Sequence, residues 1–203
     1  MLFRRAGRTS YLRYVQHRNL SNGVKYWFEK VFFMPSALDI TASPRWPHIN
    51  GYTLPFERYR DNGAHPAIVA LAKLENRKFG AEVEKILKSY FGLLPPVSTQ
   101  HDALCSPSNK PTAKIEIKSA RYWANGNDCK WQHLEPNHDY DHVLFVLVDY
   151  QDIKVWHAKK SVLFKHGLVT PQGKQGYWGI MTQLVASGYL NRVRTKADLH
   201  AAL

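Results

Sequence analysis

Cysteine is scarce in this sequence, and its scarcity argues against two kinds of protein. Only Cys105 and Cys129 occur, and the chain has no Cys-x-x-Cys pair. We therefore expect neither a zinc site built on paired cysteines nor a small fold held together by disulfides. Such cysteine usage is typical of a reducing interior compartment, so the expected location is the cytoplasm of a bacterial or viral-type system, with organellar targeting left open.

Long hydrophobic runs are also lacking. The longest, Val143–Val148, is far shorter than the roughly 20 residues that a membrane-spanning helix needs. This run predicts a buried strand, and no membrane partner is expected.

Acidic residues are few relative to basic ones, with 16 Asp and Glu against 28 Lys and Arg and a formal net charge of +12. This excess favours a polyanionic partner, most simply nucleic acid, although charge alone does not distinguish DNA, RNA and an anionic membrane. Hydrophobic residues make up 44% of the 203 residues, so the chain can build a globular domain with a real core.

The first 28 residues contain no Asp or Glu, yet they carry several basic and aromatic side chains. These are Arg4, Arg5, Arg8, Arg13, Arg18, Lys25, Tyr11, Tyr14, Tyr26 and Trp27. The composition suits either an organellar presequence or a nucleic-acid-binding arm. We favour the arm, because its aromatic side chains can pack against a core.

The order of sequence patterns predicts a helix followed by several strands. Residues 35–66 are rich in proline and predict a long irregular connection. A helical apolar stripe then runs from His65-Pro66 to Tyr90, where Gly80 either allows close packing or separates two helices, and Gly92 ends the helix.

Strands are expected around Asp102 and in the segments that follow. Those segments are 112–119, then 120–124 with 130–134 as a hairpin, and 142–148 paired with 153–157. A further helix is expected over 178–187. The predicted fold is therefore α/β (α+β), with a central mixed sheet of four to five strands flanked by helices.

Three segments are expected from this pattern. Residues 1–66 would form a basic and aromatic N-terminal segment with a long connection packed on the core, 67–157 the core, and 158–203 a basic C-terminal segment.

The central strand, residues 112–119 (TAKIEIKS), carries the most informative pair of side chains. Apolar residues alternate with Lys114, Glu116 and Lys118, so Glu116 and Lys118 point to the same face of a strand. An acid and an ammonium held side by side can be a metal ligand and a catalytic lysine, or an ion pair on a solvated edge.

The surrounding elements give this pair a context. Glu84 on a helix, Asp102 at a strand end, and Glu116 and Lys118 on the following strand together resemble the PD-(D/E)XK nuclease superfamily, which has the restriction-endonuclease-like fold. The resemblance covers about residues 76–157, less than half of the chain.

Two further positions are similar to the family pattern and one departs from it. Gly80 precedes Glu84 by four residues, as a glycine often does in the family's first core helix. Gln132 matches a polar position that some branches of the family use beside the site. The residue before Asp102 is His101 rather than proline, which leaves the identity of the first acid open.

The resemblance implies metal-dependent hydrolysis of phosphodiester bonds. Asp102, Glu116 and the carbonyl of Ile117 would hold Mg²⁺, for which Mn²⁺ normally substitutes, and carboxylates are natural ligands of such hard cations. Glu84 would serve a second ion or a bound water. Lys118 would orient or deprotonate the attacking water, or offset charge that develops on phosphorus.

Simpler explanations exist for several of these residues. Glu84 and Lys88 have the spacing of a helix-surface ion pair, and Asp102 could make only a local turn. The rival acids are Asp128, Asp139 and Asp141, and a histidine-rich zinc site would draw on His133, His138, His142 and His157. Trp123 and Trp131, which flank the predicted hairpin, are expected in the core or as cross-strand partners.

A stand-alone chain of this size with basic flanks resembles a type II restriction endonuclease. The expected partners are double-stranded DNA and a second copy of the chain, since a two-fold axis lets two sites cut both strands. The candidate DNA contacts are Arg45, Arg58, Arg60, Lys159, Lys160 and Lys174. The alternatives are a structure-specific repair or recombination nuclease, an enzyme that cleaves RNA, and a non-catalytic nucleic-acid-binding protein.

Overall fold

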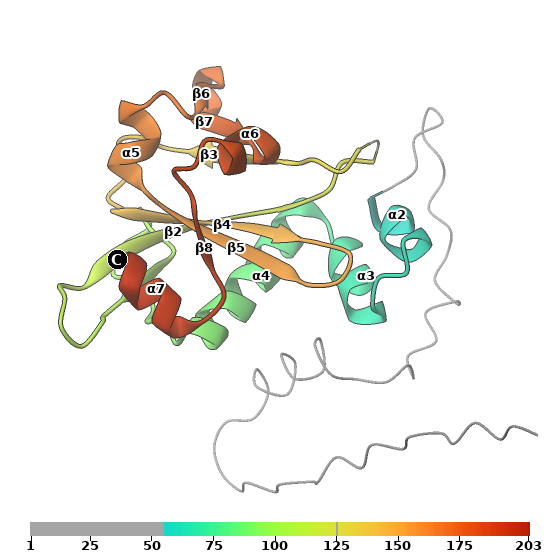
Figure 1. The fold of residues 1–203 in the computed structure, drawn as a ribbon, viewed down its shortest axis with the longest axis horizontal. Coiled ribbons are helices and arrows are strands. Elements are labelled where there is room, and N and C mark those ends of the chain that lie inside the picture. The colour runs from blue at the N-terminus through green and yellow to red at the C-terminus, as the bar shows by residue number, and fades with distance from the viewer. Residues whose placement is uncertain (1–54, 125) are drawn as a thin grey trace, which may run out of the picture.

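The computed structural model describes residues 55–124 and 126–203, which form an α+β fold around a mixed five-stranded sheet (Figure 1). The strand order is β1-β2-β4-β5-β8. The strands are β1 (Ala103–Cys105), β2 (Ala113–Arg121), β4 (His142–Val148), β5 (Ile153–Lys159) and β8 (Asn191–Val193). The predicted fold class, a mixed sheet flanked by helices, is thus confirmed.

Strands β2 and β4 form the centre of the sheet and run parallel to each other. All seven residues of β4 are buried, as expected for a strand covered on both faces. The other neighbouring strands pair antiparallel, and β5 pairs with β4 as the sequence predicts. Strand β8 comes from the C-terminal segment, which therefore adds a strand to the central sheet.

Helices α4 (Asn76–Phe91) and α7 (Lys196–Ala202) lie on one side of this sheet, the lower side in Figure 1. A Cβ atom placed on Gly80 of α4 would lie 3.9 Å from the hydroxyl oxygen of Ser119 on β2. This close approach shows that α4 packs directly across β2. Gly92 ends α4 in the left-handed conformation, with a φ of 64°, as predicted.

The predicted helical stripe differs from the structure in two respects. The chain forms two helices, α3 (Pro66–Ala72) and α4, and the break falls at residues 73–75 rather than at Gly80. Within α4, Phe91 is buried and Tyr90 is 45% exposed. The predicted stripe ended one residue early because Phe91, not Tyr90, continues the inward face of the helix.

A second, three-stranded sheet covers the other side of the central sheet (Figure 1). It consists of β3 (Lys130–Leu134), β7 (Tyr177–Ile180) and β6 (Thr170–Pro171), accompanied by α5 (Lys160–Lys165), a short 3-10 helix η1 (Gly173–Gln175) and α6 (Met181–Ala186). The predicted hairpin of 120–124 with 130–134 is wrong, since β3 pairs with β7. Trp131 lies in the core, whereas Trp123 is 42% exposed.

Two other regions also differ from the sequence-based expectation. Pro55–Asp61 form a helix, α2, inside the stretch predicted to be irregular. The helix expected over 178–187 is replaced by strand β7 followed by α6. The predicted N-terminal arm and the first part of the long connection lie outside the described residues.

None of the helices in the described part of the chain is both long and apolar enough to cross a membrane.

Candidate active site

The register between β1 and β2 brings Asp102 against the strand that carries Glu116 and Lys118. The last β1–β2 pair is Ala103 with Ile115, and the amide of Asp102 donates to the carbonyl of Ile115 at 2.9 Å. The Asp102 carboxylate in turn accepts a hydrogen bond from the amide of Ile117 at 2.7 Å. This cross-strand bond fixes the carboxylate at the edge of β2, beside the residue that separates Glu116 from Lys118.

Glu116 and Lys118 form an ion pair with 2.5 Å between Nζ and Oε1. Their side chains are 7% and 18% exposed, so this is not the solvated pair that the sequence left as an alternative. Strand alternation explains the contact, because residues two apart share a face. The β2–β4 register places the pair beside Val143 and Phe145, on an apolar stretch of the sheet.

The pKa of the Glu116 carboxyl is shifted by its surroundings. Burial raises the pKa of Glu116 above its ordinary value, and the nearby Lys118 ammonium opposes this rise. The carboxylates of Asp102 and Glu84 raise it further. Glu116 therefore lies within electrostatic range of both other predicted acids, and a cation placed among them would relieve their repulsion.

Glu84 reaches this region from α4, one helical turn after Gly80. Its carboxylate is one-third exposed and pairs with Lys88 on the same helix, as the spacing predicts. Its charge also raises the pKa of Glu116, as the smallest of the contributions to that shift. Glu84 thus forms the helix-surface pair and has a minor electrostatic effect on Glu116.

The two remaining predicted site residues are Gln132 and Ile117. Gln132 is partly exposed on β3, in the smaller sheet, and no hydrogen bond of the described residues joins it to the acids. For Ile117 the predicted ligand is the carbonyl, whereas the group that donates to Asp102 is the amide. Within residues 55–124 and 126–203, no three Asp, Glu, His or Cys side chains lie close enough together to hold a metal ion.

The three rival acids are engaged elsewhere. Asp128 accepts hydrogen bonds from the backbone and hydroxyl of Thr182. Asp139 pairs with the Lys114 ammonium at 2.6 Å, and Asp141 accepts the Lys114 amide at 3.0 Å. Asp102 is therefore the acid whose contacts lead to Ile117, next to Glu116.

The histidines do not form a zinc site in the described residues. His142 and His157 hydrogen-bond to each other through Nδ1 and Nε2 at 2.8 Å, and both are buried. His133 is exposed on β3 with a φ of 60°, and His138 lies in the loop before β4.

Tyr140 was not predicted from the sequence, yet the structure brings it close to Glu116. It is 3% exposed, and its hydroxyl has no hydrogen-bond partner among the described residues. Burial raises its pKa, and the Glu116 charge adds to the rise. The Lys160 ammonium covers the Tyr140 ring at 4.4 Å from the centroid. The only signal in the sequence was its position just before the most apolar strand.

The candidate DNA contacts have different surroundings. Arg58 donates to the carbonyls of Trp123, Ala124 and Gly126, and so holds the 122–129 loop rather than standing free. Arg60 forms an exposed pair with Asp61. Lys159 and Lys160 line a pocket described below, Lys174 lies on η1, and Arg45 lies outside the described residues.

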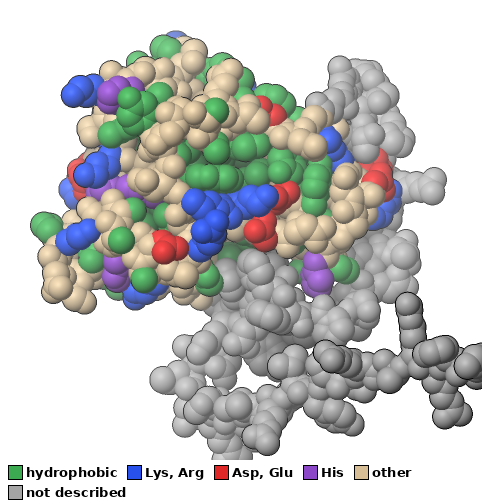
Figure 2. Space-filling model, viewed as in Figure 1, with side chains coloured by type: hydrophobic (Ala, Val, Ile, Leu, Met, Phe, Trp, Pro, Cys, Tyr) green, Lys and Arg blue, Asp and Glu red, His purple; other side chains and the backbone are tan. Residues whose placement is uncertain are grey.

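On the face that Figure 2 shows, Lys and Arg side chains adjoin acidic ones below a band of hydrophobic side chains. Two ion pairs involve residues of β5 and β8 or the turn before β5: Lys154 with Asp149, and Arg192 with Asp152 at 4.0 Å. The basic charge of these residues is thus matched by acids.

The chain matches no family model, no curated protein and no solved structure at the level at which such matches are accepted.

Proposed function

We propose that this protein is a divalent-metal-dependent endonuclease that hydrolyses phosphodiester bonds in double-stranded DNA. The observation that carries the proposal is the meeting of Asp102, Glu116 and Lys118 at one edge of β2. The Asp102 carboxylate lies 2.7 Å from the amide nitrogen of Ile117, and the Lys118 ammonium lies 2.5 Å from the Glu116 carboxylate. Glu84 on a helix, Asp102 before a short strand, and Glu116 with Lys118 on the next strand follow the order of the restriction-endonuclease-like core, which we propose for residues 76–157.

The donor set suits a hard cation. Asp102 and Glu116 offer carboxylate oxygens, and Glu84 lies within electrostatic range of Glu116. A bound Mg²⁺, or Mn²⁺ in its place, would polarise the scissile phosphate and lower the pKa of the attacking water. Glu116 is held in low-dielectric surroundings with its negative charge only partly balanced, which favours uptake of a cation.

Lys118 has the position of a group that acts on the nucleophile. Its side chain is 18% exposed, so its ammonium can exchange the Glu116 contact for a water or a phosphate oxygen. In that role Lys118 would orient the attacking water or stabilise charge on the phosphate. The Tyr140 hydroxyl has no hydrogen-bond partner in the described residues and lies within electrostatic range of Glu116, so it is a further candidate donor to a phosphate oxygen.

The open edge of β2 would give the substrate access. Strand β1 pairs with β2 only over residues 113–115, so in the described part of the chain β1 leaves the rest of that edge uncovered. The net charge of +12 favours attraction of DNA. Sequence-specific cleavage by a homodimer, as in type II restriction endonucleases, is the form that we propose.

A cleavage assay tests this function directly. Purified protein is incubated with a long duplex of known sequence in Mg²⁺, and in parallel with EDTA, as Lys118→Ala and as Glu116→Gln. We expect discrete fragments with the wild type only. Lys85→Ala, on the exposed side of α4, is the matched control and should cut normally. If the wild type cleaved neither duplex nor single-stranded nor branched DNA, the proposed nuclease activity would be refuted.

One observation favours a second candidate, a non-catalytic nucleic-acid-binding protein. Glu116 is already paired with Lys118, and Glu84 with Lys88. A binding protein could keep both pairs for stability alone. It predicts that DNA binding occurs without cleavage and that Lys118→Ala leaves the affinity unchanged.

A further inference from the structure

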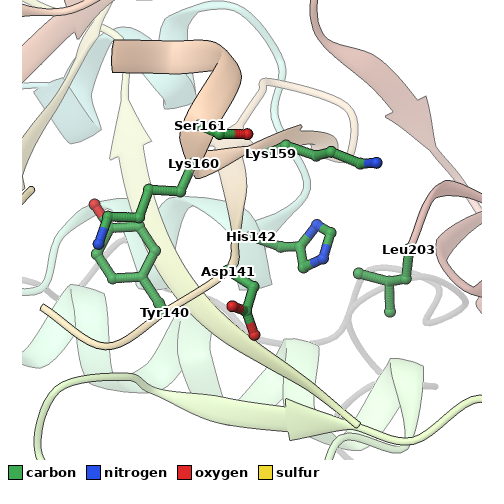
Figure 3. Close-up of a pocket in the computed structure, with 7 residues that line it drawn as sticks. All are labelled: Tyr140, Asp141, His142, Lys159, Lys160, Ser161 and Leu203. Carbon is green, nitrogen blue, oxygen red and sulfur yellow. The ribbon is translucent and has the colours of Figure 1, made fainter. Parts of the chain in front are cut away.

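A pocket of about 340 Å³ opens where β4 begins and β5 ends. Its lining residues are Tyr140, Asp141, His142, Lys159, Lys160, Ser161 and Leu203 (Figure 3). Figure 3 shows the His142 ring between Asp141 and Leu203, with Lys159 and Ser161 above it. Asp102, Glu116 and Lys118 do not line this pocket, which shares only Tyr140 with the candidate active site.

The buried end of the pocket presents a fixed hydrogen-bond donor. His142 is 8% exposed, and its Nδ1 lies 2.8 Å from Nε2 of His157. The Nδ1 of His157 is buried and has no partner in the described residues. If His142 donated in this bond, neutral His157 would carry its proton on that buried nitrogen as an unpaired N–H group, and such orphan donors are rare.

His157 is therefore the donor, and His142 carries its own proton on Nε2. Burial lowers the pKa of both rings, so both stay neutral at physiological pH. Because Nδ1 of His142 faces His157, its Nε2–H is left for the side of the ring that lines the pocket.

The rim of the pocket is basic and partly unpartnered. The Lys159 ammonium and the Ser161 hydroxyl make no hydrogen bond or ion pair with another described residue. Lys160 donates to the carbonyl of His138 at 2.5 Å and covers the Tyr140 ring. The one acid in the lining, Asp141, accepts the amide of Lys114 at 3.0 Å. Two lysines thus face one carboxylate that is already engaged.

Tyr140 connects this pocket to the candidate active site. Its ring lines the pocket, and its hydroxyl lies within electrostatic range of Glu116. In the β2–β4 register, His142 pairs with Ile115 and Val143 with Glu116, so the side chains of His142 and Glu116 leave neighbouring positions toward opposite faces of the sheet. Tyr140 is therefore the residue through which a polyanionic strand presented to Glu116 would reach the pocket.

We propose that this pocket binds a phosphate group, and that the group belongs to the backbone of the nucleic-acid strand held at the active site. The Lys159 ammonium supplies positive charge, and the Ser161 hydroxyl and the Nε2–H of His142 donate hydrogen bonds. The Lys160 ammonium, which lies over the Tyr140 ring, adds to the attraction of the phosphate. The assignment to a nucleic-acid strand rests on the proposed function, whereas the affinity for phosphate does not.

Two measurements test this proposal without catalysis. First, inorganic phosphate is titrated into isotope-labelled protein while the ring nitrogens of His142 are followed by NMR. Second, binding of a short duplex is measured by fluorescence anisotropy in EDTA over a range of KCl concentrations. We expect phosphate to shift the His142 signals in the wild type but not in Lys159→Ala.

Lys159→Ala should also weaken duplex binding about tenfold, as for loss of one charged hydrogen bond, and reduce the salt slope by about one. Lys165→Ala is the matched control, because this exposed lysine on α5 does not line the pocket. An equal loss in that control would overturn the site, and so would the absence of any shift with phosphate.

A phosphate response without any effect of Lys159→Ala on the duplex would overturn the strand assignment and indicate a small phosphate ligand instead. Failure of the nuclease itself looks different, because binding in EDTA would depend on Lys159 although the wild type never cut. That outcome would support the phosphate-binding pocket and refute only the proposed cleavage of DNA.

Discussion

Strand β2 carries two lysine–acid pairs of nearly equal length and opposite character. Lys114 lies 2.6 Å from Asp139, with side chains 35% and 54% exposed. Lys118 lies 2.5 Å from Glu116, with side chains 18% and 7% exposed. The hydrogen bond from Lys114 lowers the pKa of Asp139, whereas burial raises the pKa of Glu116 in spite of its lysine. Burial, rather than the length of the ion pair, decides the electrostatic character of each acid.

This comparison bears on function. A solvated pair holds its acid ionised and stable, and the acid gains little from a further cation. A buried pair leaves its acid poorly compensated, so a metal ion or a change of protonation has a large effect there. The Glu116 end of β2 is the end where chemistry is expected.

The largest expected difference is between the effects of replacing Lys118 and of replacing Lys114 on stability and cleavage. Lys118→Met should lower the free energy of unfolding by about 3 kcal/mol at neutral pH, because a buried carboxylate loses its partner. It should also reduce cleavage by at least about 100-fold. Urea unfolding and a cleavage assay measure the two effects.

Lys114→Met is the matched control, on the same strand and in an exposed pair. It should leave both quantities close to those of the wild type. Equal effects of the two substitutions would show that burial does not distinguish the pairs.

The buried His142–His157 pair extends the comparison to pH. Burial lowers the pKa of His157 from 6.5 to about 4, so the unfolded chain binds more protons than the folded chain between these values. Stability should therefore fall as the pH drops from about 6.5 to 4, by roughly 3 kcal/mol for this ring at about 1.4 kcal/mol per pKa unit.

Urea unfolding at several pH values measures this slope, and His157→Leu should flatten it. His166→Gln, at an exposed histidine, is the control and should keep the wild-type slope. A slope that persists in His157→Leu would assign the acid sensitivity to other groups.

Tyr140→Phe separates a structural role from a functional one. The hydroxyl is buried without a described partner, so its removal should leave stability unchanged or raise it by about 1 kcal/mol. Cleavage should fall about tenfold if the hydroxyl donates to a phosphate oxygen. A stability loss with unchanged cleavage would mean that the hydroxyl has a structural partner instead.

The smallest expected effect is the difference between the pKa values of Glu116 and Asp139. Carboxyl NMR titration should place the pKa of Glu116 above the ordinary value for glutamate and that of Asp139 below the value for aspartate. The Glu116 contribution to stability should therefore rise as the pH falls through its folded pKa, and that of Asp139 should decline. Addition of Mg²⁺ should lower the pKa of Glu116 and leave the pKa of Asp139 unchanged.

The parts of the fold that could be predicted were those set by local periodicity. Alternation in β2 and the continuous apolar run of β4 identified the centre of the sheet. The hairpin failed because its turn residues, 125–128, are compatible with a loop, and the pairing of β3 with β7 joins segments over 40 residues apart. No local pattern encodes such a pairing.

The candidate site shows the same division. Glu116 and Lys118 share a face because strands alternate, so their contact followed from spacing alone. The hydrogen bond from Ile117 to Asp102 and the approach of Tyr140 depend on how β1 and the loop before β4 fold back on β2. Arg58 could not be distinguished from a DNA contact, because its loop partners are backbone carbonyls.

The bond between Asp102 and the Ile117 amide also has a consequence for assembly. Within the described residues, β1 does not pair with β2 beyond Ile115, and a strand edge left unpaired is a template for intermolecular pairing and aggregation. The Asp102 carboxylate accepts a hydrogen bond from one backbone amide of that edge and places a negative charge beside it. The side chain that is proposed to bind metal therefore also opposes pairing of this edge with another strand. Replacing it with alanine to abolish cleavage would also remove this protection, and a loss of soluble protein should accompany the loss of activity.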